Sequence, residues 1–166
     1  MTTHWHPAYI GLGSNLDEPE VQIGVARRSL ENLPGTRVCA HSSMYQTSPM
    51  GPSDQPDFVN AATAVLTQLD AMSLLGHLQA IEIAQGRVRD RERWGPRRID
   101  LDLLVFGRLQ MADEILQVPH PGIPERNFVL LPLMDIAPQL LVPGLGTVAR
   151  LNSQLPADAA AIRRLD

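Results

Sequence analysis

The sequence contains no lysine, because all fourteen of its basic residues are arginine. This absence excludes a P-loop lysine, a Schiff-base lysine and a lysine general base. Any chemistry on phosphate groups must therefore use arginine side chains, backbone N–H groups and metal ions.

Cysteine is almost absent as well. The single Cys39 cannot form an internal disulfide, which is typical of a reducing compartment, and we expect it to be a small buried residue. The first residues lack the basic and apolar regions of a signal peptide, and no apolar run approaches the roughly 18 residues of a membrane helix. These features predict a cytoplasmic protein that makes no membrane contact.

Length and charge narrow the class of protein further. The 166 residues predict one domain, residues 1–166, and a composition of 44% hydrophobic and 19% charged residues is ordinary for a globular chain with a real core. The formal net charge of −4 argues against nucleic acid as a partner.

The hydrophobic pattern predicts alternating strands and helices. Predicted strands cover residues 8–12, 36–46, 58–67 and 99–106, and predicted helices cover 19–33, 71–85, 125–136 and 149–155. We expect Asp17 and Asp70 to be the N-caps of the first two helices, and residues 108–111 to pair with the strand before them. Because hairpins join several strands, the pattern favours an α+β fold of the ferredoxin-like kind, with a mainly antiparallel sheet flanked by helices.

Two segments between these elements carry further signals. Gly11 and Gly13 suggest a dinucleotide-binding turn, but Leu16 stands where the G-x-G-x-x-G pattern needs its third glycine, so a plain strand–turn–helix is favoured. Residues 47–57 form a long loop with three prolines. A loop of this length predicts a lid or a binding loop, with a simple connector as the alternative.

The segment 87–98 carries six arginines around Trp94. Asp90 and Glu92 stand between them, so the local excess is four positive charges (six minus two) in a chain whose total charge is negative. Arginine is well suited to bidentate recognition of phosphate, and the concentration favours a small polyanion. A self-neutralising surface loop is the alternative, and Trp94 could stack on a planar ring or fill part of the core.

Asp100 and Asp102 follow this segment in the predicted strand 99–106. Alternation along a strand points both side chains to one face, with Cα atoms roughly 6–7 Å apart. Two like charges there are costly unless water or a cation compensates them, and magnesium binds through one or two carboxylates together with substrate phosphates. A solvated strand end is the alternative. The aspartate face is expected to continue with Leu104 and Phe106, and the core face to carry Ile99, Leu101, Leu103 and Val105.

Two further polar positions are candidates for the same region. Gln79 and Glu82 share one flank of the predicted helix 71–85, which ends where the arginine segment begins, so they could border the site. A solvated helix face is favoured by the local sequence. His120 lies between two prolines, where a hydrogen bond to a ligand or to the backbone is favoured over a role as catalytic base.

The run from Gln85 to Asp102, with its arginines, Trp94, Gly95-Pro96 and the two aspartates, resembles the signature of the 6-hydroxymethyl-7,8-dihydropterin pyrophosphokinase family. Further matches extend the resemblance over residues 9–138. They lie at residues 11–16, 51–52, 55–60, 118–120 and 126–128.

The resemblance implies an ATP-dependent enzyme of folate biosynthesis. Such an enzyme transfers the terminal pyrophosphoryl unit of ATP, its co-substrate, to the hydroxymethyl oxygen of the pterin and releases AMP. Asp100 and Asp102 would hold two magnesium ions, and Arg87 and Arg97 would assist the transfer, so these four are the implied catalytic residues. The implied nucleotide contacts are Gln79, Glu82, Arg87, Arg89, the backbone at Leu103, His120 and Arg126.

The same resemblance implies a pterin pocket. We expect the protein to act as a monomer. Trp94 and Phe128 would sandwich the pterin, and Asn60 would read its hydrogen-bonding edge. Thr47, Ser48 and Met50 would border it, together with Phe58, which stands where a tyrosine is frequent. Among the arginines, Arg91, Arg93 and Arg98 are expected to have surface or structural roles.

The chain departs from the family pattern on the nucleotide side. Ile115 stands where some relatives have an arginine, Gln117 replaces a threonine, and Asp90 replaces a basic residue. Two alternatives stay open, because a metal site with arginines does not specify the acceptor and because these departures lie on the nucleotide side. One is another magnesium-dependent pyrophosphoryl or nucleotidyl transferase, and the other is a divergent paralogue that binds pterin or nucleotide without turnover.

Overall fold

The computed structural model describes residues 4–48, 55–86, 98–156, 159 and 161–166. Its strands are β1 His6–Ser14, β2 Thr36–His41, β3 Tyr45–Thr47, β4 Phe58–Thr67, β5 Asp100–Phe106, β6 Met111–Ala112, β7 Gln117–Val118, β8 Leu141–Val142, β9 Gly146–Thr147 and β10 Ile162–Arg164. Its helices are α1 Pro19–Glu31, α2 Ala71–Ala84, the short 3-10 helix Ile123–Glu125, α3 Asn127–Ile136 and α4 Val148–Ser153.

One large antiparallel sheet organises the described residues. Its strands follow the order β10-β3-β4-β1-β5, and β2 pairs with β4 as well. Two small hairpins, β6-β7 and β8-β9, lie outside this sheet. The prediction of a mixed α and β fold with a mainly antiparallel sheet is confirmed. No helix in the described part of the chain has the length and hydropathy that a bilayer crossing requires.

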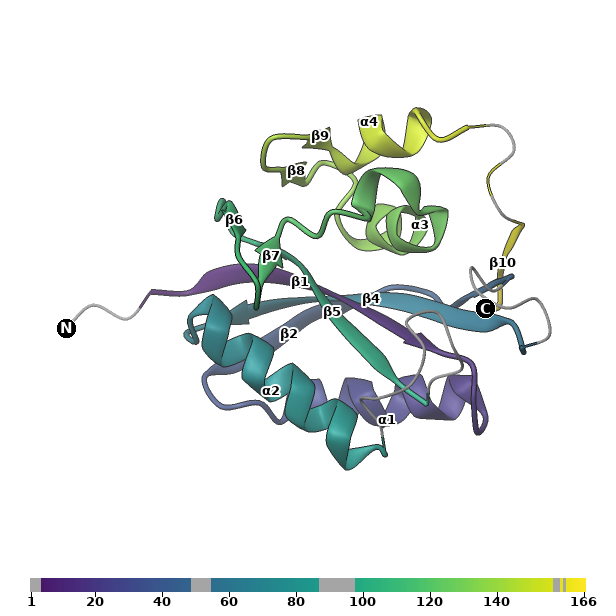
Figure 1. Ribbon diagram of the computed structural model, residues 1–166, viewed down its shortest axis with the longest axis horizontal. Coiled ribbons are helices and arrows are strands. Elements are labelled where there is room, and N and C mark those ends of the chain that lie inside the picture. Colours follow the sequence, from purple (N-terminus) through teal and green to yellow (C-terminus); the bar gives the residue numbers. More distant parts are fainter. Residues whose placement is uncertain (1–3, 49–54, 87–97, 157–158, 160) are drawn as a thin grey trace.

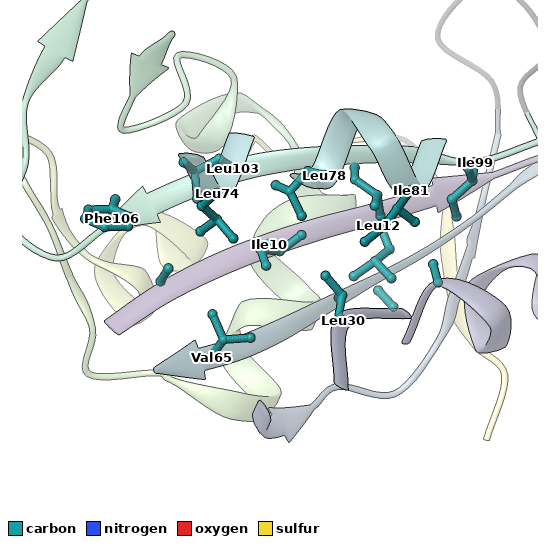
Figure 2. Close-up of a cluster of buried hydrophobic side chains, with 14 of the residues drawn as sticks. Ile10, Leu12, Leu30, Val65, Leu74, Leu78, Ile81, Ile99, Leu103 and Phe106 are labelled. Carbon is teal, nitrogen blue, oxygen red and sulfur yellow. The ribbon is translucent and has the colours of Figure 1, made fainter. Parts of the chain in front are cut away.

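The helices cover both faces of the sheet (Figure 1). Helices α1 and α2 lie on one face, and α3 and α4 lie on the other. Figure 2 shows the larger core cluster, in which side chains of β1 and β5, such as Ile10 and Leu103, meet Leu30 of α1 and Leu78 of α2. The second cluster lies on the α3 and α4 side of the sheet. The sheet is therefore the middle layer between two helical layers.

A register shift in β5 overturns part of the predicted alternation. The pairing of β1 with β5 moves from Tyr9–Val105 to Ile10–Leu103, so Leu104 is the extra residue of a β-bulge. Beyond the bulge the faces exchange. Val105 packs in the second cluster beside Leu104, and Phe106 packs in the first cluster beside Leu103, opposite to the prediction for both.

The N-terminus of α1 also differs from the prediction. The N-cap is Glu18, in a left-handed conformation and without a side-chain cap bond, and the side chain of Asp17 bonds instead to Arg98. The cap predicted for α2 is confirmed, because the Asp70 carboxylate accepts a hydrogen bond from Ser73 N at 2.8 Å. Tertiary contact with Arg98 therefore displaced the local capping preference of Asp17.

Three smaller predictions were wrong at the edges of the sheet. The predicted strand 36–46 is divided between β2 and β3, which pair with successive parts of β4. Residues 108–111 do not pair with β5, because Met111 belongs to β6 and pairs with β7. Cys39 is exposed rather than buried. It is the extra residue where the register of β2 shifts between Val38 and Ala40, so its side chain leaves the packed face.

Burial predicts how α2 contributes to stability. Replacing Leu78, which is 0% exposed, with alanine should lower the free energy of unfolding by about 3 kcal/mol, because a cavity remains among packed side chains. Ile83→Ala on the same helix is the matched control, since Ile83 is 56% exposed and should cost less than about 1 kcal/mol. Urea unfolding followed by circular dichroism measures both, and equal losses would contradict the assignment of the buried face.

Candidate functional site

The centre of the candidate site is the part of β1 that carries Gly11 and Gly13. Gly13 of β1 lies between Asn60 of β4 and Asp100 of β5, and Gly11 lies between Ala62 and Asp102. Residues directly opposite in a ladder share a face, so Asn60 and the aspartates lie on the same side of the sheet. Two strand spacings put the Cα atoms of Asn60 and Asp100 about 10 Å apart, with Gly13 between them.

The close approach of Asn60 explains the glycine at position 13. A Cβ atom there would lie 2.9 Å from Asn60 Oδ1, which is closer than side chains tolerate. The Asn60 amide therefore leans over the β1 backbone and uses the space that glycine leaves. This requirement accounts for Gly13 without a dinucleotide.

Asp100 and Asp102 are both partly exposed on this face of β5, opposite the face that carries Leu101 and Leu103 into the core. The Asp102 side chain is 39% exposed. Among the described residues, no group of three or more His, Cys, Asp and Glu side chains could enclose a metal ion. Two carboxylates on one open face still match the hard oxygen donors that magnesium prefers when phosphate oxygens complete its shell.

Glu82 differs from the solvated position that the local sequence favoured. It is only 5% exposed, and its Oε2 accepts a hydrogen bond from Leu101 N at 2.8 Å. Leu101 stands between the two aspartates, on the edge strand of the sheet, so Glu82 holds the backbone that carries them. The period of a strand directs the Leu103 N–H toward the same edge, where a ligand could reach it.

His120 lies beside the aspartates, on the loop after β7. Its backbone N donates to Leu104 O at 2.8 Å, and its Nδ1 accepts from Gly122 N at 3.0 Å. In the neutral ring the proton is therefore on Nε2, which lies 4.0 Å from Asp102 Oδ2. Burial foremost, and then the positive charge of Arg126, lower the pKa of His120, while Asp100 raises it.

Arg126 and Phe128 lie next along the chain, where the 3-10 helix leads into α3. The Arg126 guanidinium lies 5.8 Å from the ring centroid of Phe128. A Cβ at position 122 would lie 2.5 Å from Arg126 Nε, so Gly122 leaves room for this side chain. His120, Arg126 and Phe128 are thus brought together by one short segment.

Asn60 and Thr47 form the other half of the site. The Asn60 Nδ2 donates to Thr47 Oγ1 at 2.9 Å, and the two residues are 8% and 3% exposed. Tyr45 lies opposite Asn60 in the ladder, and its hydroxyl donates to Asp135 of α3 at 2.9 Å. Burial and this carboxylate raise the pKa of Tyr45 to about 12, so its hydroxyl keeps the proton that it donates. The sequence pattern did not single out Tyr45 or Asp135, because residues 90 apart give no local signal.

The structure describes some of the remaining predicted residues, and the others lie outside the described part of the chain. Gln79 is partly buried on α2, Ser48 is exposed after β3, and Phe58 is partly buried at the start of β4. Ile115 is 68% exposed in the turn between β6 and β7, and Gln117 is exposed in β7. Several predicted residues lie outside the described residues: Met50, Arg87, Arg89, Asp90, Arg91, Arg93, Trp94 and Arg97.

Arg98 stands immediately after that part of the chain. Its Nη2 lies 2.7 Å from Asp17 Oδ2, and its Nη1 donates to Gln85 O at 3.2 Å. The guanidinium therefore ties the start of β5 to the end of α2 and to the turn after β1. This contact agrees with the structural role expected for Arg98.

The described residues thus form a mixed α and β protein with a mainly antiparallel sheet and two partly exposed carboxylates on one face of its edge strand. The sequence model of the family described as 7,8-dihydro-6-hydroxymethylpterin-pyrophosphokinase (HPPK) matches residues 9–138. The chain belongs to this family.

Curated relatives agree with this assignment. One relative is the Pseudomonas aeruginosa protein named 2-amino-4-hydroxy-6-hydroxymethyldihydropteridine pyrophosphokinase. It is 52% identical to this chain, over 81% of this chain and 83% of that protein. The proteins of the same name from Methylorubrum extorquens and Haemophilus influenzae are 45% and 44% identical, over 96% and 89% of this chain and 98% and 91% of theirs.

A solved structure shows the same fold. The wild-type HPPK-DHPS protein of Plasmodium falciparum matches with a TM-score of 0.74 at 16% identity, over 92% of this chain and 45% of that chain. The chain thus spans less than half the length of that protein. At this identity the likeness supports the arrangement of strands and helices alone.

The geometry around His120 predicts its titration. In an NMR titration of the metal-free protein, the pKa of His120 should lie below 6.5, the ordinary value for histidine, because burial disfavours the charged ring. The pKa of His120 is thus lower in the folded protein than in the unfolded chain. The free energy of unfolding should therefore decrease as the pH falls from about 6.5 through the folded-state pKa.

The variant Arg126→Gln should raise the His120 midpoint, because removing a nearby positive charge favours the protonated ring. Arg150→Gln, an exposed substitution on α4, is the matched control and should leave the midpoint in place. An identical midpoint in wild type and Arg126→Gln would contradict the electrostatic contact.

Proposed function

We propose that this chain transfers the pyrophosphoryl group of ATP to the hydroxymethyl group of 6-hydroxymethyl-7,8-dihydropterin and releases AMP, as a step of folate biosynthesis. The observation that carries the proposal is the row formed by Asn60, Gly13 and Asp100, which puts Asn60 and the carboxylates on one face of the sheet. Membership of the family supplies the identity of the two substrates.

We also propose a ferredoxin-like fold, a single domain and a cytoplasmic monomer. The order β1, α1, β2 with β3, β4, α2, β5 and the sheet order β3-β4-β1-β5 support a ferredoxin-like fold. We place the activity in one domain, residues 1–166, that works as a monomer in the cytoplasm. The negative net charge and the single cysteine support this placement.

The bond changes define what the two halves must hold. The pterin hydroxyl oxygen bonds to the β-phosphorus of ATP, and the bond from that phosphorus to the oxygen of the α-phosphate breaks. AMP leaves with this oxygen, and the hydroxyl proton is released. Such a transfer depends mainly on alignment of the reacting groups and on stabilisation of charge on the phosphate oxygens.

On the carboxylate half, Asp100 and Asp102 would hold magnesium, two ions in all. Magnesium would supply charge neutralisation for the triphosphate and a fixed position for it. Glu82 keeps the strand between the aspartates in place through Leu101 N. His120, through its Nε2 proton, and Arg126 would donate hydrogen bonds to nucleotide oxygens. We further propose nucleotide contacts for Gln79, Arg87, Arg89 and Leu103 and assistance to transfer for Arg87 and Arg97.

On the acceptor half, Asn60 would read the pterin. Its bond to Thr47 uses one amide hydrogen, so a second hydrogen and the carbonyl oxygen stay available for the donor and acceptor edge of the ring. Phe128 on α3 and Phe58 on β4 would supply apolar contact. Ser48, Met50 and Trp94 complete the proposed pterin contacts.

The decisive assay mixes the protein with ATP, magnesium and the hydroxymethyl dihydropterin. AMP should form in step with pterin diphosphate, and chromatography with phosphorus NMR measures both products. Pyrophosphate in place of AMP would indicate a nucleotidyl transferase, and pterin binding without any product would indicate a paralogue without turnover.

The variant Asp102→Asn should reduce kcat by about 100-fold or more, because a neutral amide is a poor ligand for magnesium. Its free energy of unfolding should stay within about 1 kcal/mol of wild type, since the side chain is partly exposed. Glu20→Gln on α1 is the matched control for loss of one exposed negative charge. Activity within a few-fold of wild type in Asp102→Asn would show that the metal assignment is wrong.

The variant Thr47→Val tests the acceptor half. It removes the hydroxyl that accepts from Asn60 at 2.9 Å and leaves the volume nearly unchanged, so the amide loses its fixed orientation. KM for the pterin should rise about tenfold while KM for ATP stays within about twofold. Thr36→Val at the start of β2 is the control, since its hydroxyl bonds to Thr67 away from the site. A pterin KM equal to that of wild type would remove Thr47 from the proposed pocket.

A further inference from the structure

Strand β10 lies outside the region that matches the family, yet it borders the acceptor half. The family match ends at residue 138, and β10 covers Ile162–Arg164. It pairs antiparallel with β3, the three-residue strand that carries Thr47. The pairs are Ile162–Thr47, Arg163–Gln46 and Arg164–Tyr45.

The Ile162–Thr47 pair puts β10 next to the proposed pterin-reading residues. Directly opposite residues share a face, so Ile162 lies beside Thr47 on one side while Phe58 of β4 lies beside it on the other. Thr47 is therefore only 3% exposed, although its strand is short and lies near the end of the sheet. This burial protects from water the hydrogen bond that orients Asn60.

Hydrogen bonds tie β10 to β3 along its length. Leu165 N donates to Met44 O at 2.9 Å, and the alternation of an antiparallel ladder makes Arg163–Gln46 the next hydrogen-bonded pair. The Arg163 side chain adds a bond from its Nη2 to Gln46 Oε1 at 2.7 Å. The Gln46 amide in turn donates to Asp57 Oδ2 at 3.1 Å, immediately before β4 begins.

A hollow of about 210 Å³ opens at this junction. Its lining comes from three parts of the chain: the end of β3 and Ser48, Asp57 before β4, and residues 161–163. Thr47 and Ser48, which we place in the pterin pocket, are therefore also neighbours of β10 across an open space.

We propose that β10 is a positioning element for the acceptor half of the site, acting through Thr47 on the orientation of the Asn60 amide. This inference rests on the proposed function, since it concerns the pterin of that reaction. Without β10, the short β3 would be an edge strand with unpaired backbone groups and would open more often. The carboxylate half would be unaffected, because β5 lies on the opposite side of β1 from β4 and β3.

Two substitutions at one position separate the backbone of β10 from its side chain. Arg163→Pro removes the N–H that the ladder assigns to Gln46, whereas Arg163→Ala keeps that N–H and removes only the exposed side chain. We expect Arg163→Pro to raise KM for the pterin about tenfold and to leave KM for ATP within about twofold. Arg163→Ala should leave both constants within about twofold of wild type.

A second variant and a binding measurement keep the test decisive. Ile162→Ser retains the ladder but exposes Thr47, and it should raise the pterin KM in the same direction. Circular dichroism and thermal unfolding accompany each kinetic measurement. Equal changes in both KM values, or an unchanged pterin KM in folded Arg163→Pro and Ile162→Ser, would overturn the positioning role. Loss of the fold in both variants would also overturn it, because β10 would then be a folding element.

Failure of the proposed function is distinguishable from failure of this inference. If wild type forms no AMP, the proposed function fails, and the fluorescence of bound pterin measured with the same variants decides the positioning role. Weaker pterin binding in Arg163→Pro than in Arg163→Ala supports the role of β10, and equal binding overturns it. A wild-type protein that neither turns over nor binds the pterin overturns both.

Discussion

The geometry of the candidate site depends on the close contact between Asn60 and the bare backbone of β1. Because Gly13 has no side chain, the amide of Asn60 occupies the space that a Cβ there would fill, between β4 and Asp100 of β5. The other face of the same strand buries Ile10 and Leu12 against the helices. One strand thus supplies both the centre of the core and the floor of the site.

Hydrogen bonds from buried donors then fix the residues around this floor. Glu82 accepts from the backbone between the two aspartates, Thr47 orients Asn60, and Asp135 accepts from Tyr45. A buried polar group without a partner would cost about 1–3 kcal/mol, so each of these bonds favours one arrangement over its alternatives. These three bonds connect α2 to β5, β3 to β4 and α3 to β3. The positions of the site residues are therefore set by contacts between elements and not within them.

Local sequence signals predicted the elements that local physics controls. The Asp70 cap, the apolar stripe of α2 and the two aspartates on one face of β5 follow from capping and from the periods of helix and strand, and the structure has all of them. The errors fall where a tertiary contact competes with a local preference. Asp17 bonds to Arg98 instead of capping α1, and bulges at Cys39 and Leu104 reverse the expected faces, because a bulge arises from pairing with another strand.

By itself, the sequence determined the chemistry that is available: arginines in place of lysine, two carboxylates two residues apart on a strand, and the signature of the family. These depend on residue type and on short spacings, which the chain carries before it folds. Only the tertiary structure decided that Asn60 faces Asp100 across Gly13, that Glu82 is buried, and that β10 lies against Thr47. Such contacts join residues 19 to 115 positions apart, and no local pattern encodes which distant partner a side chain will meet.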